Sequence, residues 1–203
     1  MKAPRGEGWI QLYSGKAFYP LDPRVEEMDV ESIIHGCSLE NRYAGQTRLP
    51  ITVGQHQCHV FDAAITLMES YGFDPKDKEL ARTIGYESLF HDAHEGLGFR
   101  DLPAPIKRYP AFAEYRRLAD QCQDVVWELL GIKPTLGTSG FVHNMDMVLL
   151  ATEKRDFCGP EPYEWGRLPD PLPEILVPWK WRRAEDEMTV RYKMLLSWES
   201  HVK

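Results

Sequence analysis

The 203-residue sequence has few cysteines, no long hydrophobic run and no cluster of basic residues. Cys37, Cys58, Cys122 and Cys158 lie far apart and form no CxxC pair, which argues against a disulfide framework or a cysteine-based zinc site. The longest apolar stretches, such as residues 147–151, are much shorter than the roughly 20 residues of a transmembrane helix. Because the first residues also lack the apolar middle of a signal peptide, we expect a cytoplasmic protein without membrane partners.

Positive charge is also scarce, since 24 Lys and Arg face 31 Asp and Glu, giving a formal net charge of −7. Without a basic stripe, we expect no nucleic-acid polymer as a partner, although a local cationic pocket for one small phosphate is compatible with this balance. The composition, 43% hydrophobic and 27% charged, is that of an ordinary globular chain. It excludes a wholly disordered chain or a coiled coil.

Hydrophobic residues recur with a helical period from residue 23 onward. Two aromatic runs within residues 8–22 predict a short hairpin or an extended arm, and six prolines in residues 157–183 predict a surface excursion. The sequence therefore predicts an all-α fold of five to seven helices, in a single domain over residues 1–203. The expected helices run from a cap at Asp29 to about Ala44, from Thr52 to Gly72, from Asp74 to Phe90, and over residues 111–130, 139–157 and 184–200.

The segment Leu89-Phe-His-Asp-Ala-His-Glu95 carries the strongest chemical signal. His91 and Asp92 are adjacent on a helix rim, and Glu95 lies on the same face. Burying these groups is costly unless a cation binds them, and imidazole with carboxylate suits Mn, Fe, Co, Ni or Zn. A solvated polar helix end is the alternative interpretation, and any one histidine is more often structural than a ligand.

Two further segments strengthen the metal hypothesis. His56 opens an expected helix and Asp146 lies on another, so that the order along the chain is His, His-Asp, Asp. Each gap between these stretches holds about one helical hairpin, and three antiparallel helices would bring the four side chains together. Such a set leaves positions open for water and a substrate oxygen, as in catalytic sites. Glu153, seven residues after Asp146, is expected to orient a neighbour or to form an ion pair.

With these motifs the sequence resembles the HD-domain phosphohydrolases. It is most similar to the bacterial 5′-deoxynucleotidases and the phage-associated HD hydrolases, a group that includes dATP triphosphohydrolases. The resemblance covers roughly residues 8–156. The matching pieces are Asn41-Arg-Tyr43, Thr52-Val-Gly-Gln-His56, Leu89-Phe-His-Asp-Ala-His-Glu95, Asp101-Leu-Pro-Ala-Pro-Ile-Lys107 and His143-Asn-Met-Asp146.

The resemblance implies an HD-domain helical bundle that hydrolyses deoxynucleoside 5′-monophosphates or deoxynucleoside triphosphates. It implies one divalent metal ion (Mn, Co, Fe, Ni, Zn or Mg), Glu95 as the group that orients or deprotonates the attacking water, and Arg42 on the phosphate. Asp101 matches a residue that helps to place the water, although one residue more than in the family pattern separates it from His91. Lys107 is expected either to contact phosphate or to cover the proline-containing loop. The implied metal ligands are His56, His91, Asp92 and Asp146, and the implied assembly is a homodimer or larger.

Two other classes of function stay open from the residues alone. One is a regulatory module that holds a metal or nucleotide without turnover, and the other is a structural helical domain whose polar helix ends happen to align. Glu95 distinguishes an enzyme from the regulatory module, because a sensor has no need of a group that deprotonates water.

Overall fold

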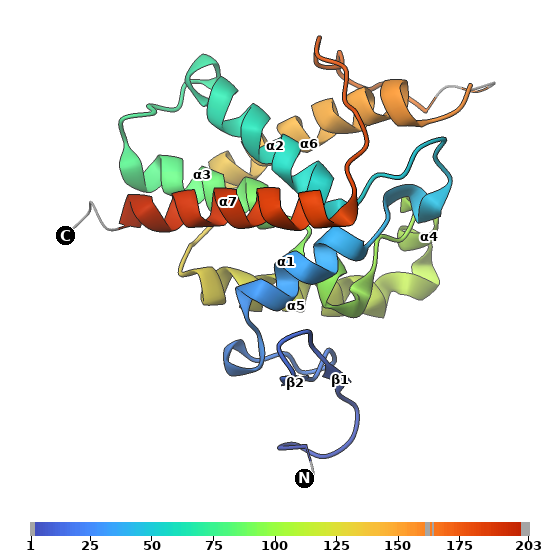
Figure 1. Cartoon of the computed structure of the whole chain (residues 1–203), viewed down its shortest axis with the longest axis vertical. Helices are drawn as coiled ribbons and strands as arrows, with labels where there is room; N and C mark the ends of the chain where they lie inside the picture. The colour runs from blue at the N-terminus through green and yellow to red at the C-terminus, as the bar shows by residue number, and fades with distance from the viewer. Residues whose placement is uncertain (1–2, 161–162, 164, 200–203) are drawn as a thin grey trace.

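The computed structural model describes residues 3–160, 163 and 165–199 (Figure 1). This part of the chain is mostly helical, with seven α-helices and one two-stranded sheet, which confirms the all-α prediction. The helices are α1 (Val30–Leu39), α2 (Val53–Leu67), α3 (Lys78–Phe90), α4 (Ala104–Lys107), α5 (Ala113–Leu130), α6 (Leu136–Phe157) and α7 (Trp181–Glu199).

The predicted hairpin is present near the N-terminus. Strand β1 (Ile10–Gln11) pairs antiparallel with β2 (Ala17–Phe18), and Gly15 takes a positive φ of 87° in the connecting turn. The hairpin lies at one end of the molecule, beside α1 and α5 (Figure 1). Phe18 is fully buried in the main apolar cluster, so this side chain anchors the hairpin to the helices.

Side-chain caps fix the helix starts that position the site. Asp29 accepts a hydrogen bond from the Ser32 N–H at the start of α1, and Thr52 accepts one from the Gln55 N–H at the start of α2, as predicted. The predicted start of α3 at Asp74 is wrong. Asp74 instead accepts the Lys76 N–H in a local turn, and Asp77 caps the helix.

The predicted end of α1 at Ala44 is also wrong, because the helix stops at Leu39. Beyond it, Asn41 pairs with Thr52 in an isolated antiparallel bridge. Tyr43 and Ala44 then take positive φ values of 58° and 50°, a conformation that is rare and strained for residues other than glycine. The chain thus leaves the helix to present Arg42 from a tight, strained turn.

The last two long helices begin earlier than predicted. Helix α6 starts at Leu136, where Thr135 and Thr138 form a capping box, and α7 starts at Trp181. Residue 200, the predicted end of the last helix, lies outside the described residues. The proline-rich excursion before α7 is tied to α2, since the Gln55 side chain donates to the Val177 carbonyl and accepts from the Trp179 N–H.

Helices α2 and α3 lie at the centre of the packing. Helix α7 packs against α1, α2 and α3, and α6 packs against α2 and α3 (Figure 1). One apolar cluster joins α1, α2, α3, α5 and α7, and another joins α2, α3 and α6. Three of the four predicted metal ligands, His56, Asp146 and His91, lie on α2, on α6 and at the end of α3, three helices in mutual contact.

A π-turn (Glu95–Phe99) follows α3 and packs directly on α1. Its Arg100 N–H donates to the Glu95 carbonyl five residues earlier, a spacing that takes up one more residue than an α-helical turn. Gly36 and Gly96 make the contact possible, since a Cβ on Gly36 would overlap with the Gly96 carbonyl oxygen. This close packing fixes the backbone that carries Glu95.

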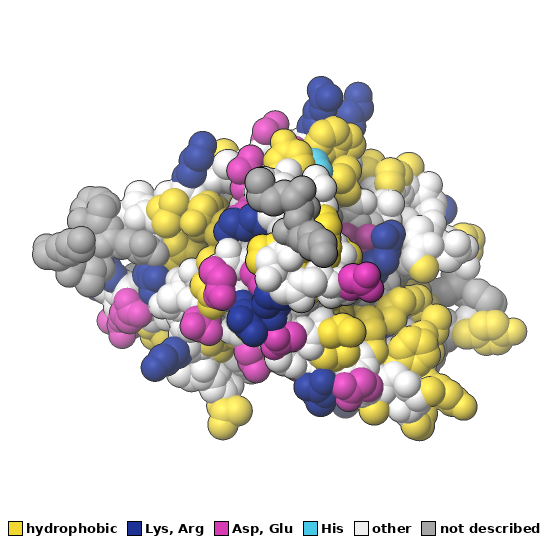
Figure 2. Space-filling view, turned by 90° about the horizontal axis from the view of Figure 1, so that it is seen from below, with side chains coloured by type: hydrophobic (Ala, Val, Ile, Leu, Met, Phe, Trp, Pro, Cys, Tyr) yellow, Lys and Arg dark blue, Asp and Glu magenta, His cyan; other side chains and the backbone are white. Residues whose placement is uncertain are grey.

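All four cysteines are buried free thiols, in agreement with the expected absence of disulfides. On the face seen in Figure 2, acidic and basic side chains are intermingled with apolar ones. In the described part of the chain, none of the helices has both the length and the apolar character needed to cross a bilayer.

Candidate metal centre

Three of the four predicted ligands meet at one point. His56 Nε2 lies 3.2 Å from His91 Nε2 and 3.1 Å from Asp146 Oδ1, and donor atoms of the three side chains all lie within 4.8 Å of one another. His56 is in the first turn of α2, His91 directly follows α3, and Asp146 lies within α6. The crossing of these three helices therefore creates the cluster.

The outer nitrogens of both imidazoles are already engaged. His56 Nδ1 is 2.6 Å from Glu153 Oε1, and His91 Nδ1 is 2.9 Å from the Ser88 carbonyl oxygen. Because both partners are acceptors, each neutral ring keeps its proton on Nδ1 and turns the Nε2 lone pair toward the other ring. Two lone pairs and the Asp146 carboxylate then face one another, an arrangement that requires a shared cation or proton.

The spacing of these donors fits a divalent ion. Neighbouring ligands at about 2.1 Å from an octahedral ion lie about 3 Å apart. The separations from His56 Nε2 to His91 and to Asp146, 3.2 and 3.1 Å, match that value. Mixed imidazole and carboxylate donors also suit Mn, Fe, Co, Ni or Zn. The residues present thus fit the metal that the sequence predicted.

Asp92, the fourth predicted ligand, borders the cluster. Its Oδ2 lies 3.3 Å from His91 Nε2, and Asp92 also forms a second group of candidate donors with His94 and Glu95. The side chains of Asp92 and Asp146 are 25% and 28% exposed, whereas His56 is fully buried. The centre is therefore closed behind His56 and open to solvent between the two aspartates.

The charged groups of the cluster shift one another's pKa values. Burial alone would lower the pKa of His91, but the Asp92 carboxylate outweighs it and raises that pKa to about 9. Burial would raise the pKa of Asp146, but the neighbouring His56 and His91 imidazoles outweigh it and lower that pKa to about 2. In the metal-free chain a proton on His91 therefore supplies positive charge at neutral pH, and a metal ion would replace it.

Glu95 lies beside the centre and is almost fully buried. Its Oε1 accepts a hydrogen bond from Lys107 Nζ at 3.1 Å, while its Oε2 is buried and has no partner among the described residues. Burial and the nearby Asp92 and Asp101 carboxylates raise the pKa of Glu95 to about 8. An unpaired, basic carboxylate oxygen at this position is suited to accepting a proton.

Arg42 also lies beside Asp92. Its Nε donates to Glu153 Oε2 at 3.0 Å, and its Nη1 lies 4.0 Å from Asp92 Oδ2. The residue is buried, yet the Glu153 bond uses only Nε. The terminal nitrogens keep donors for a ligand at the edge of the centre, and a planar guanidinium matches two phosphate oxygens.

Asp101 belongs to neither cluster of candidate donors in the described residues. Its Oδ2 accepts the Tyr43 N–H at 2.9 Å, so the carboxylate supports the strained turn that carries Arg42.

Two side chains contribute more to the site than the sequence pattern indicates. His94, in the same motif as His91, joins the second donor group with Asp92 and Glu95. Glu153 forms an ion pair, as expected, and its partner is Arg42; it also contacts His56 Nδ1 and accepts from the Tyr43 hydroxyl. Its spacing of seven residues from Asp146 indicated the helix face, but the convergence of three donors depends on tertiary structure.

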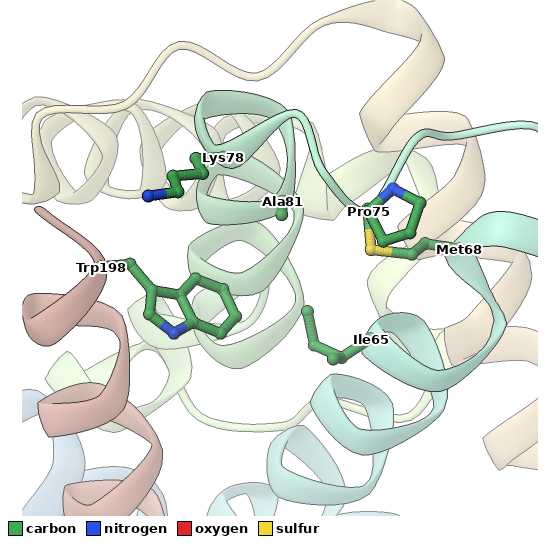
Figure 3. Close-up of a pocket in the computed structure, with 6 residues that line it drawn as sticks. All are labelled: Ile65, Met68, Pro75, Lys78, Ala81 and Trp198. Carbon is green, nitrogen blue, oxygen red and sulfur yellow. The ribbon is translucent and has the colours of Figure 1, made fainter. Parts of the chain in front are cut away.

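A separate pocket of about 300 Å³ lies between α2, α3 and α7 (Figure 3). It contains none of the predicted site residues and is mainly apolar, with the Lys78 side chain as its charged member. Its lining consists of Ile65, Met68, Pro75, Lys78, Ala81 and Trp198.

Comparison of the whole chain with protein-family models and with curated proteins finds no match.

Proposed function

We propose that this chain is a divalent-metal-dependent phosphohydrolase with an HD-type helical bundle, acting on deoxynucleoside 5′-monophosphates or triphosphates. The observation that carries the proposal is the convergence of His56, His91 and Asp146, with Asp92 at the open side. The basic side chains of Arg42 and Lys107 near the acidic groups favour an anionic substrate, because a phosphoryl group requires neutralisation of its charge.

Each residue around the centre has a physical task in this reaction. A bound divalent ion supplies a Lewis acid for a phosphoryl oxygen and lowers the pKa of coordinated water. Arg42 binds phosphate oxygens through its terminal nitrogens. Glu95 takes the water proton on Oε2, the oxygen without a partner among the described residues, while Lys107 holds Oε1 in place. As the water oxygen bonds to phosphorus, the bond from phosphorus to the nucleoside oxygen breaks, and the proton held on Glu95 returns to that leaving oxygen. The negative charge that builds up on the phosphoryl oxygens is balanced by Arg42 and Lys107.

The test is a hydrolysis assay on a panel of deoxynucleotides with Mn²⁺ or Co²⁺, resolving inorganic phosphate from triphosphate. We expect release of one of these products, and loss of at least about 100-fold in kcat/KM for His91→Ala and Asp92→Asn. Exposed Arg48 provides a control, because Arg48→Lys leaves the centre intact. Full activity in His91→Ala or Asp92→Asn overturns the assignment of the site.

A second candidate function is a non-catalytic module that binds metal or nucleotide for regulation. The Glu95–Lys107 ion pair favours it. Glu95 is the group to which the enzyme mechanism assigns proton transfer, and Lys107 already occupies one of its two carboxylate oxygens. Glu95→Gln separates the two. Loss of turnover at unchanged metal content supports the enzyme, whereas tight nucleotide binding by the wild type without any turnover supports the regulatory module.

A further inference from the structure

Glu153 is fully buried on α6, and both of its carboxylate oxygens are in use. Oε1 lies 2.6 Å from His56 Nδ1, and Oε2 accepts from Arg42 Nε at 3.0 Å and from the Tyr43 hydroxyl at 2.7 Å. A side chain without solvent access has no water to take over these bonds if they are lost. The three donors therefore depend on this one carboxylate for their orientation.

On one side, Glu153 determines how His56 faces the metal centre. The bond to Nδ1 holds the ring with its Nε2 lone pair directed at His91 and Asp146. The corresponding partner of His91 is the neutral carbonyl of Ser88. Glu153 is thus a charged acceptor behind a metal ligand, and such acceptors increase the basicity of the ligand.

On the other side, Glu153 determines where Arg42 presents its terminal nitrogens. It engages Nε and leaves Nη1 4.0 Å from Asp92. The turn that carries Arg42 is strained, since Tyr43 and Ala44 both have positive φ. The Tyr43 hydroxyl bond to Glu153 and the Tyr43 N–H bond to Asp101 hold this turn in place.

We infer that Glu153 is a positioning residue that couples metal binding through His56 to phosphate binding through Arg42. The phosphate half of this inference rests on the proposed function, whereas the metal half rests on the geometry of the centre alone. Because binding linkage is reciprocal, metal in the centre and phosphate on Arg42 strengthen one another through the shared carboxylate.

Glu153→Gln is the direct test, because His56 Nδ1 and Arg42 Nε bond different oxygens of Glu153. The amide places an NH2 donor at one of those two positions, where it faces a donor instead of accepting from it. We expect the affinity for Mn²⁺, measured by calorimetric titration, to fall by about 10–100-fold. The affinity for inorganic phosphate at saturating Mn²⁺ should fall by at least about 10-fold. Glu128 lies exposed on α5, so Glu128→Gln is the matched control and should bind both probes as the wild type does.

Circular dichroism and thermal melting establish whether the variant is folded. A folded Glu153→Gln protein that keeps wild-type Mn²⁺ affinity overturns the inference. If it does not fold, Glu153→Asp, which keeps a charge opposite Arg42, is measured instead with the same expected loss in Mn²⁺ affinity. If neither folds while Glu128→Gln does, Glu153 serves the fold and the inference is likewise overturned.

The design separates this inference from the proposed function. Mn²⁺ binding that depends on Glu153, in a wild-type protein that neither binds phosphate nor hydrolyses nucleotides, rejects the proposed function and the phosphate half of the inference. Nucleotide hydrolysis with equal Mn²⁺ affinity in the wild type and Glu153→Gln rejects the inference and retains the function.

Discussion

Glu95 combines three properties that rarely occur together at one residue: burial, a lysine partner and a carboxylate oxygen without a partner in the described structure. Burial among other acids makes its proton hard to remove, whereas Lys107 works in the opposite direction. A group balanced in this way changes its protonation near neutral pH, where general bases are most effective.

This balance predicts a pH dependence of stability in the metal-free protein. Since the pKa of Glu95 is raised from 4.5 to about 8 by folding, the folded chain holds this proton more tightly than the unfolded chain. The stabilisation is present below about pH 4.5 and is lost as the pH rises through about 8. The unfolding free energy of the wild type, minus that of Glu95→Gln, should fall across this window by more than about 1.4 kcal/mol, the equivalent of one pKa unit.

Urea unfolding at several pH values, with a chelator present, measures this difference. The subtraction removes other titrating groups that the two proteins share, including His91 and Asp146. A difference that stays constant between pH 4.5 and 8 would show that Glu95 ionises normally in the folded chain.

A second prediction for a single residue concerns the shape of the Arg42 side chain, tested by a substitution that keeps its charge. Lysine keeps the positive charge opposite Glu153 but has no planar fork for two phosphate oxygens. We expect Arg42→Lys to lower kcat/KM for nucleotide hydrolysis by about 10–100-fold, equivalent to about 1.4–2.7 kcal/mol. Arg48→Lys, an exposed change in the same loop, should leave kcat/KM within about two-fold of the wild type. Equal rates for both variants would remove Arg42 from the phosphate site.

At the scale of elements, the position of Glu95 depends on how closely α1 approaches the π-turn. A Cβ on Gly96 would lie 2.6 Å from the Cys37 nitrogen and 2.9 Å from the Ile33 carbonyl oxygen. Both neighbours are helix backbone, so α1 itself must move to make room. The contact therefore links the packing of a whole helix to the placement of one carboxylate.

Gly96→Ala should accordingly destabilise the protein by about 1–3 kcal/mol, the usual cost of overpacking, and displace Glu95 from the centre. Gly140, exposed on α6 with open space within 4 Å of the position that a Cβ would take, provides the matched change. Gly140→Ala should stabilise the fold by about 0.5–1 kcal/mol, because alanine is the better helix former. Denaturant titration of both variants checks the sign, and a neutral Gly96→Ala would contradict the close approach.

The same elements show what the sequence predicts well. Helix starts at Asp29 and Thr52 were predictable because the cap is a local interaction between a side chain and a backbone N–H three residues on. The end of α1 was not, because the bridge between Asn41 and Thr52 depends on a partner eleven positions away. Local chemistry is visible in sequence, whereas pairing across a loop requires the packed structure.

The candidate site likewise has features that the sequence predicts and features that only the packed structure shows. Periodicity and motif order placed His56, His91 and Asp146 on three helices, and the structure brings them together. The convergence of His56, Arg42 and Tyr43 on Glu153 was not predictable in full, because it depends on the strained turn after α1 and on the angle between α2 and α6. Residue types therefore indicate chemistry, and helix crossing decides which pairs form.

At the scale of the whole molecule, the centre joins α2, α6 and the end of α3, so a ligand bound there holds three helices together. Any ion that binds the folded chain and not the unfolded one raises the unfolding free energy, by about 2.7 kcal/mol at a hundredfold excess over Kd. For a chain of this length each kcal/mol corresponds to about 2–4 °C, so Mn²⁺ should raise Tm by about 5–10 °C. His91→Ala should lose this shift while Glu128→Gln keeps it. Calorimetric melting with and without Mn²⁺ measures both, and an equal shift in His91→Ala would place the ion elsewhere in the molecule.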